Sequence, residues 1–423
     1  MVRHILLTND FPPKVGGIQS YLWELWRRLP PDEVVVFTSA YPGAQAWDSR
    51  QKFRVVRAHE PVLLPQPHLA RRVRELAAST GAEAVVIDPA LPLGLVGPHL
   101  GLPYAVVLHG AEVTVPGRLP ASRQLLARSL RGASLLVAAG KYPEMEARRA
   151  MRAGRDRAGD KAGNKAGTGA GTEAGAGDAL EGPPAVLIPP GVDTERFHPL
   201  PHIDRAAARA RLGLPRTGHL VVSVSRLVPR KGMDTLIEAA TSLSARFGHE
   251  GLSVAIAGAG RDRGRLERLE RVAGQAGVTV KLTGRLADAD LPDFYACADV
   301  FALCCRSRWW GLEQEGFGIV LLEAAACGIP CITVDSGGAG EAVVNGETGL
   351  VVTPDDDPSP KTSQRRALVR PVAEALSTLL SDAGVARRMG EAGQRRAEEE
   401  FSYDILAPRL AAALDRLPLS TGR

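Results

Sequence analysis

The sequence lacks the long apolar run that a membrane-crossing helix needs, which is about 18 consecutive apolar residues. Its start, Met1 to His4, leads into a short apolar stretch and lacks the pattern of a secretory signal peptide. We therefore expect a cytoplasmic protein with no spanning segment.

Cysteine is scarce and shows no metal-ligand spacing. All five cysteines fall within apolar stretches of the second half: Cys297, Cys304, Cys305, Cys327 and Cys331. This placement predicts buried, reduced thiols and excludes a disulfide scaffold.

Aromatic residues are also few, at 5% of the chain, and no nucleic-acid-binding module is recognisable. The formal net charge is +5. A basic excess suits phosphate-bearing ligands or an anionic lipid surface, and we expect no nucleic-acid partner.

Short apolar segments alternate with amphipathic helical patterns through both halves of the chain, which predicts two α/β domains with doubly wound parallel sheets. The expected domains are 1–190 and 191–401, with a helix in 402–423 crossing back to the first. Ligands in such folds bind at the carboxyl ends of strands, so we expect the site in a cleft between the domains. The expected strands are Arg3–Thr8, Glu33–Ser39, Phe53–Ala58, Ala84–Asp88, Tyr104–His109, Ser134–Ala138, Leu220–Val224, Ser253–Ala257, Val278–Thr283, Val300–Leu303 and Cys331–Val334.

Residues 153–184 are rich in glycine and alanine with scattered charges. This composition cannot bury a core and predicts a disordered insertion with no role in chemistry.

Four local patterns suggest a ligand site. In the stretch TNDFPPKVGGIQSYL, Gly16 and Gly17 stand between the first strand and the first helix, where a ligand can approach the backbone and the helix amides attract anions. An ordinary strand-to-helix turn is the alternative.

The second pattern, SRLVPRKG, places Arg226 and Lys231 after a strand, where they could grip a diphosphate. The alternative is a solvated basic loop.

The third pattern, EGFGIVLLE, places Glu315 before an apolar helix and Glu323 within it. The amides that follow Gly316 can face a phosphate. A carboxylate in an apolar context such as that of Glu323 needs a partner, either a sugar hydroxyl or a structural hydrogen bond.

The fourth candidate is His109 at the end of the strand YAVVLHG, a plausible contact for a reacting group, although a lone histidine is usually structural. The stretch GAGRDRG (258–264) has its glycines out of register for a dinucleotide fingerprint and indicates a backbone turn.

These motifs, together with LHGAE, IPPGVDTERF and SGGAGEAV, occur in an order that resembles the retaining glycosyltransferases of family 4, which have the GT-B fold. The resemblance covers nearly the whole chain except the insertion. NDFPP, the glycine pair and SRLVPRKG are most similar to the actinobacterial branch that transfers mannose from GDP-mannose to phosphatidylinositol monomannoside.

The resemblance implies a role for each candidate. Gly16 and Gly17 let the first loop approach the donor diphosphate and the acceptor, and His109 lies near the donor sugar. Arg226 and Lys231 neutralise the leaving diphosphate. Glu315 and the amides of Phe317, Gly318 and Ile319 hold the sugar hydroxyls, and Glu323 holds the ribose.

The resemblance also implies a front-face reaction without a metal or other cofactor. The chain agrees, because no Asp-x-Asp pair stands at an expected strand end. The implied partners are a nucleotide-sugar donor and a lipid acceptor.

Two helices suggest contact with an anionic membrane at the inner face of the cell membrane. One combines Trp23 and Trp26 with Arg27 and Arg28, and the stretch 117–132 carries four arginines. A core-facing tryptophan pair and a solvated basic face are the alternatives.

Three departures from the family pattern, at Ala111, Trp309–Trp310 and Gly340, leave other hypotheses open. These are a family 4 transferase with another nucleotide sugar or a soluble acceptor, and a GT-B-like epimerase or non-catalytic binding protein.

Overall fold

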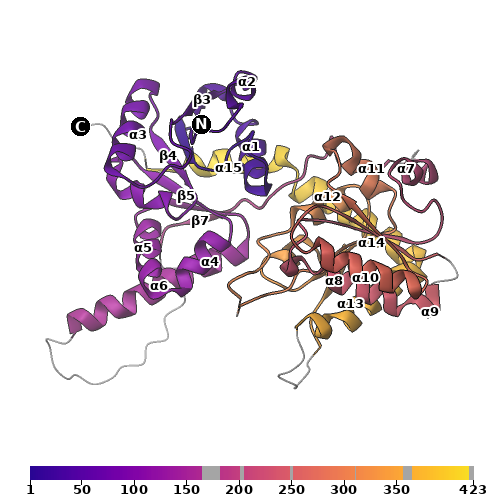
Figure 1. The fold of residues 1–423 in the computed structure, drawn as a ribbon. Coiled ribbons are helices and arrows are strands. Elements are labelled where there is room, and N and C mark those ends of the chain that lie inside the picture. The colour runs from indigo at the N-terminus through magenta and orange to yellow at the C-terminus, as the bar shows by residue number, and fades with distance from the viewer. Residues whose placement is uncertain (164–181, 201–203, 248–250, 310, 356–363, 419–423) are drawn as a thin grey trace. The chain divides into compact units, whose positions relative to one another are not determined.

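The computed structural model describes residues 1–163, 182–200, 204–247, 251–309, 311–355 and 364–418 (Figure 1). The chain divides into two compact units, Met1–Pro189 with Leu406–Arg423, and Pro190–Ile405. Each is described by itself, and the expected cleft between them stays a prediction.

The first unit is built on a parallel sheet of seven strands in the order β3-β2-β1-β4-β5-β6-β7. The chain runs outward from β1 in one direction and from β4 in the other, as in a doubly wound fold. Its central strands are apolar and fully buried, which explains their near-continuous Val/Ile/Leu runs. The strands are β1 (His4–Thr8), β2 (Val34–Thr38), β3 (Arg54–Arg57), β4 (Ala84–Asp88), β5 (Tyr104–Leu108), β6 (Leu135–Ala138) and β7 (Ala185–Leu187).

The helices of the first unit connect these strands, as parallel pairing requires. They include α1 (Gly17–Trp26), α2 (Ala44–Asp48), α3 (Pro67–Thr80), α4 (Ala111–Arg118), α5 (Pro120–Arg131), α6 (Lys141–Gly163) and α15 (Tyr403–Leu414). Three-residue to seven-residue 3₁₀ segments, η1 (Pro31–Glu33) and η2 (Leu93–His99), complete the unit.

The second unit carries a parallel sheet of six strands in the order β10-β9-β8-β11-β12-β13. The strands are β8 (Leu220–Val224), β9 (Ser253–Ala257), β10 (Thr279–Gly284), β11 (Val300–Leu303), β12 (Cys331–Val334) and β13 (Gly349–Val352). The helices are α7 (Arg205–Arg211), α8 (Met233–Ser242), α9 (Ser244–Phe247), α10 (Arg263–Gln275), α11 (Leu291–Ala296), α12 (Ile319–Ala326), α13 (Gln364–Ser381) and α14 (Ala383–Glu400), with the 3₁₀ turns η3 (Pro229–Lys231), η5 (Asp288–Asp290) and η6 (Ala339–Ala342). The two doubly wound sheets confirm the predicted fold class.

The prediction for residues 153–184 was wrong at its start, because residues 153–163 continue α6. Its end agrees with the prediction, since β7, the edge strand of the first sheet, begins directly after Pro184. Alanine and charged residues favour a helix even where no core can form, which explains the extended α6. The middle of the stretch, 164–181, lies outside the described residues.

Helix α15 ends the described chain and joins the first sheet's unit from Leu406 onward. The amide of Val2 donates to Asp415, and the guanidinium of Arg409 donates to the carbonyl of Leu187 at the end of β7. Leu406, Leu410 and Leu414 are fully buried. The end of the chain is thus part of this unit's core.

All five cysteines are buried and free, as predicted. Burial raises the pKa of the Cys304 thiol to about 12 and that of Cys297 to about 11, so both stay protonated. None is therefore suited to act as a nucleophile.

Candidate active site

In the first unit, the candidate residues collect at the carboxyl ends of three neighbouring strands, β1, β4 and β5. Gly16 is the N-cap of α1, and Gly17 is its first residue and is exposed. A side chain at Gly16 would meet the carboxamide of Gln19. The glycine pair therefore lets the loop lie close to α1 and leaves the first amides of the helix accessible at Gly17.

A chain of hydrogen bonds links this loop to His109. Asp10 accepts from Gln19 at 2.6 Å and from Lys14 at 2.6 Å, and its own amide donates to the Thr8 hydroxyl at 2.8 Å. Thr8 donates to one oxygen of Asp88 at 2.7 Å. The other oxygen of Asp88 accepts from His109 Nε2 at 2.6 Å.

The pairing with Asp88 favours a charged imidazole at His109. Burial opposes the charge, but the Asp88 carboxylate, with smaller contributions from Glu112 and Asp10, raises the pKa of His109 above its ordinary value. The stabilisation from this pair is full below the ordinary histidine pKa and is lost as the pH rises through the raised one. With Nε2 bound to Asp88, Nδ1 is the ring nitrogen left for a ligand.

The turn after His109 is closed from within the chain. Glu112 accepts from the backbone amides of His109, at 2.5 Å, and of Gly110, at 3.1 Å. Gly110 has a φ of 145°, which a residue with a side chain rarely adopts. The imidazole packs edge-on against Tyr21, with ring centroids 5.3 Å apart. His109 is therefore held in one orientation by its neighbours.

Thr8 and Asp88 are part of this cluster, and the sequence motifs did not identify them as site residues. Both are fully buried polar residues at the last position of an apolar strand. A buried carboxylate at the end of an apolar strand needs a partner, so Asp88 could have been recognised as a candidate site residue from the sequence.

In the second unit, the candidates lie at the carboxyl ends of the adjacent strands β8 and β11. Arg226 follows β8 and is exposed. Lys231 lies in η3 and is 8% exposed, with its amine 2.7 Å from Glu315 Oε2. Arg226 and Lys231 thus differ in environment although the sequence pairs them.

Glu315 is the centre of this cluster. Arg230 donates to the same Oε2 that Lys231 contacts, and Cys305 Sγ lies 3.3 Å from it. Burial opposes the charge on Glu315, but Lys231 and Arg230 lower its pKa to about 2. The resulting stabilisation is fully present above the ordinary carboxyl pKa and is lost as the pH falls from there through the lowered pKa of Glu315, about 2. Arg230 belongs to the quoted SRLVPRKG stretch, but no local pattern distinguishes it from Arg226 as a site residue.

The helix after Glu315 begins at Ile319. Gly318 has a φ of 85° and is the N-cap of α12. The Phe317 side chain is buried and packs on Phe401, with ring centroids 5.7 Å apart. Phe317 can therefore offer a ligand only its backbone, while the amides of Ile319 and the next residues lie at the free end of α12.

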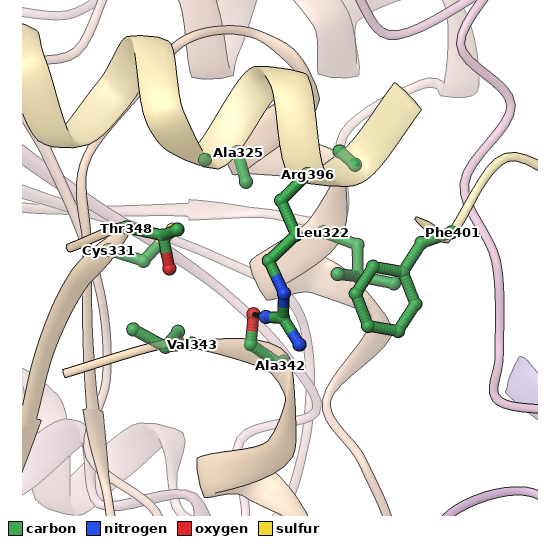
Figure 2. Close-up of a pocket in the computed structure, with 10 residues that line it drawn as sticks. Leu322, Ala325, Cys331, Ala342, Val343, Thr348, Arg396 and Phe401 are labelled. Atoms are coloured by element: carbon green, nitrogen blue, oxygen red, sulfur yellow. Dashed lines mark hydrogen bonds between the residues drawn. The ribbon is translucent and has the colours of Figure 1, made fainter. Parts of the chain in front are cut away.

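The support behind this turn comes from α14 (Figure 2). Arg396 projects from α14, donates to the carbonyls of Ala342 and Glu341 at 3.0 and 3.1 Å, and lies over the Phe401 ring at 4.7 Å. Because Phe401 also contacts Phe317, this layer fixes the start of α12 from the side of the core.

Glu323 lies one turn into α12 and is half-buried. The hydroxyl of Tyr295, on α11, donates to Glu323 Oε2 at 2.6 Å. Burial raises the pKa of Glu323, while this hydrogen bond opposes the rise. The structural hydrogen bond considered from the sequence is thus present, and it occupies one oxygen of the carboxylate.

The two loops of this cluster are joined by a buried ion pair. Asp234, 1% exposed, begins α8 just after Lys231, and Arg306 follows β11 before Glu315. Arg306 reaches both oxygens of Asp234 at 2.9 Å, and its amide donates to the carbonyl of Arg230. Arg265 contacts Asp234 at 2.6 Å. This pair holds the loops that carry Lys231 and Glu315 in register.

The proposed membrane helix at α1 is corrected by the structure. Trp26 is fully buried, and its indole donates to His4 Nε2 at 2.8 Å. Arg27 and Arg28 both bind Glu24. Of the two tryptophans of α1, Trp26 therefore faces the core, whereas Trp23 is half-buried and donates to Gln51 at 2.9 Å. Among the described residues, no helix is both long and apolar enough to cross a bilayer.

The second basic segment has a more open surface. Leu119, just before α5, is 52% exposed, and Leu125 on α5 is 48% exposed and lies one turn from the exposed Arg128. Arg118 lies 3.4 Å from Glu146, and Arg131 binds the carbonyl of Met151. Part of the arginine set is thus engaged in packing α4, through Arg118, and α5, through Arg131, against α6.

Trp309, one of the departures from the family pattern, has an unusual backbone conformation. Trp309 has a φ of 50° and is 57% exposed, with the Arg308 guanidinium 4.7 Å from its ring centroid. Its neighbour at position 310 lies outside the described residues. The loop before Glu315 thus presents an aromatic surface.

Comparison with known proteins matches the two units to one family. Residues 204–396 match the family model for glycosyl transferases group 1. A Mycobacterium tuberculosis (H37Rv) protein named GDP-mannose-dependent alpha-(1-6)-phosphatidylinositol monomannoside mannosyltransferase is 37% identical, with 97% of each chain covered. A Corynebacterium glutamicum protein, named for the same reaction on a monoacylated acceptor, is 34% identical, with 98% of each covered.

Solved structures show the same architecture at lower identity. The Anabaena protein HepE, in complex with UDP and glucose, aligns with a TM-score of 0.70 and 19% identity, covering 99% of this chain and all of that one. The glycosyltransferase WaaG aligns with a TM-score of 0.59 and the same identity. Because the mycobacterial and corynebacterial relatives align along almost the whole chain, the protein belongs to the group 1 glycosyltransferases, and it has the GT-B fold that its motifs predicted.

Proposed function

We propose that the protein transfers mannose from GDP-mannose to a mannosylated phosphatidylinositol lipid, with retention of configuration and an α-1,6 linkage. The observation that carries the proposal is the sequence identity of 34–37%, over 97–98% of the chain, to relatives named as GDP-mannose-dependent phosphatidylinositol monomannoside mannosyltransferases. The proposal also rests on the presence of the complete set of candidate residues, because a non-catalytic binding protein would not be expected to keep them all.

The second unit supplies the groups for the donor diphosphate. Arg226, Arg230, Lys231 and Arg308, which also binds Glu313, carry four positive charges, and Glu315 and Glu313 offset two of them. Two net positive charges and the amides at the start of α12 then face the phosphates. We assign Glu315 to the sugar hydroxyls and Glu323 to the ribose.

In this proposal the reaction needs no metal, because cations fixed in the protein take the charge of the departing diphosphate. Such preorganised groups act without reorientation at the moment of bond breaking. The leaving phosphate takes the proton of the acceptor hydroxyl on the same face of the sugar. His109, whose pKa Asp88 raises, is assigned to the donor sugar through Nδ1, and the Gly16–Gly17 turn to the diphosphate and the acceptor.

We further propose that the enzyme works at an anionic membrane on the cytoplasmic side, as a peripheral protein. The support is the exposed surface of α5, where Leu125 lies one turn from Arg128, together with the exposed Leu119 just before the helix. Apolar side chains next to cations suit the boundary between headgroups and acyl chains. The lipid acceptor of the similar enzymes fits such a surface.

The donor assignment predicts that GDP binds more tightly than UDP or ADP. Isothermal titration calorimetry with each diphosphate measures the preference directly, and we expect at least a tenfold difference, about 1.4 kcal/mol. A preference for UDP would contradict the mannosyl assignment and favour a family member with another nucleotide sugar. No binding of any of the three would favour a non-catalytic protein.

A further inference from the structure

The carboxylate of Glu323 has one protein partner among the described residues, and that partner comes from a different helix. Tyr295 Oη on α11 donates to Oε2 at 2.6 Å. The second oxygen, Oε1, has no hydrogen-bond partner in the described part of the chain. Oε1 is also absent from the side-chain atoms that are both fully buried and unpaired among the described residues. One oxygen is therefore fixed, and the other is open to a ligand.

The phenol ring of Tyr295 cannot follow a moving carboxylate. It is fully buried and touches three aromatic rings edge-on or tilted, at centroid distances of 5.8 Å (Phe197), 6.4 Å (Phe294) and 5.6 Å (Phe301). Rings packed this closely keep a single orientation. The hydroxyl is thus a fixed point at the end of a rigid side chain.

The hydrogen bond also controls the charge of Glu323. Burial, together with the Glu323 carboxylate, raises the pKa of Tyr295 well above its usual value, so the hydroxyl remains a donor. Donation to Glu323 opposes the increase in the carboxyl pKa that burial causes. Without it, Glu323 would be protonated at a higher pH and would lose an acceptor for hydroxyl groups.

We propose that Tyr295 is the positioning residue for nucleotide binding: it fixes Glu323 so that the free oxygen of the carboxylate accepts from the ribose diol of a nucleoside diphosphate sugar. The inference rests on the proposed function, because it takes the ribose as the ligand of Glu323. Tyr295 itself does not touch the ligand.

The variant Tyr295→Phe removes the hydroxyl and keeps the ring. We expect it to weaken binding of the nucleoside diphosphate about tenfold at pH 7, as for a hydrogen bond to a charged group, and to leave kcat at saturating donor within about twofold. The acidic decline of affinity should move to higher pH, because the pKa of Glu323 rises. The probe is whichever of GDP, UDP and ADP binds the wild-type protein most tightly, so a wrong base assignment does not affect the result.

Two comparisons separate positioning from a general structural effect. The matched control is Tyr104→Phe, which removes another buried hydroxyl, bound to the carbonyl of Ser129 at 2.8 Å in the first unit. It should lower the melting temperature similarly and leave nucleotide affinity unchanged. The 2′-deoxy diphosphate should bind the wild type less tightly than the ribose form, and this difference should shrink in Tyr295→Phe.

Glu323→Gln completes the test as a double-mutant cycle. If Tyr295 acts through Glu323, then adding Tyr295→Phe to Glu323→Gln should change nucleotide affinity by less than about twofold. Wild-type affinity in Tyr295→Phe would overturn the proposal. An equal loss of affinity for the ribose and 2′-deoxy diphosphates would overturn it as well, because the effect would then not pass through the sugar.

Discussion

Arg226→Ala is expected to lower kcat/KM by about 100-fold or more, while the melting temperature stays unchanged. The loss corresponds to about 3 kcal/mol of transition-state stabilisation, which is typical for one preorganised group facing a developing charge. The side chain is exposed at the end of β8, so its removal disturbs no packing. Steady-state kinetics measures the loss of kcat/KM, and a thermal melt of the same preparation measures the melting temperature.

Lys231→Ala should cost as much activity but behave differently in the melt. Lys231 is buried against Glu315, and its loss leaves that carboxylate with Arg230 and Cys305 as partners. We therefore expect a lower melting temperature for this variant. Arg226→Lys should restore only part of the activity, because lysine lacks the bidentate fork of arginine.

The matched control is Arg268→Ala, which removes an exposed arginine from α10 and should keep full activity. Added EDTA should leave the wild-type rate unchanged. Near-normal turnover in both Arg226→Ala and Lys231→Ala would contradict the assignment of this loop. Loss of activity in EDTA that Mg²⁺ restores would contradict the metal-free proposal.

Asp234→Ala is expected to lower the free energy of unfolding of the second unit by about 3–5 kcal/mol, because it leaves the buried guanidinium of Arg306 without its anion. Arg306 is 6% exposed and directs both ends of its guanidinium to Asp234, and Arg265 contacts the same carboxylate. Urea unfolding of the full chain, followed through the transition of this unit, measures the change.

A surface pair provides the control. Asp355 binds Arg370, whose side chain is 67% exposed, so Asp355→Ala should cost less than about 1 kcal/mol. Asp234→Asn, which keeps the shape and removes the charge, should lie between the two. If Asp234→Ala shifted the urea midpoint no more than Asp355→Ala does, the buried pair would not be what holds the two loops.

The strands with continuous apolar runs could be predicted to within a residue or two, because burial on both faces of a parallel sheet dictates such runs. The two that were not identified, β7 and β13, are short edge strands and are only partly buried. Their three or four residues carry too little pattern to separate a strand from a loop. The α6 extension was not predicted because helix propensity can act in a segment that has no core to bury.

The site residues were recognised by motif, but their partners were not. The sequence places Lys231 and Glu315 far apart, and only the pairing of β8 with β11 brings their loops together. Asp88 and His109 meet for the same reason, because β4 and β5 are neighbours. A pair of this kind depends on strand order, which local spacing does not contain. Trp26 was ambiguous since its helical face alone does not say whether it meets the core or a lipid surface.

The proposed transfer of mannose to the lipid acceptor is tested most directly by measuring product formation from GDP-mannose. The full-length protein is incubated with radiolabelled GDP-mannose and vesicles of anionic phospholipid that contain phosphatidylinositol monomannoside, and the lipid product is isolated for mass spectrometry and linkage analysis by NMR. We expect one added mannose in an α-1,6 linkage, and little product from Arg226→Ala. Transfer only to a soluble acceptor, transfer only from another nucleotide sugar, or a product of inverted configuration would contradict it.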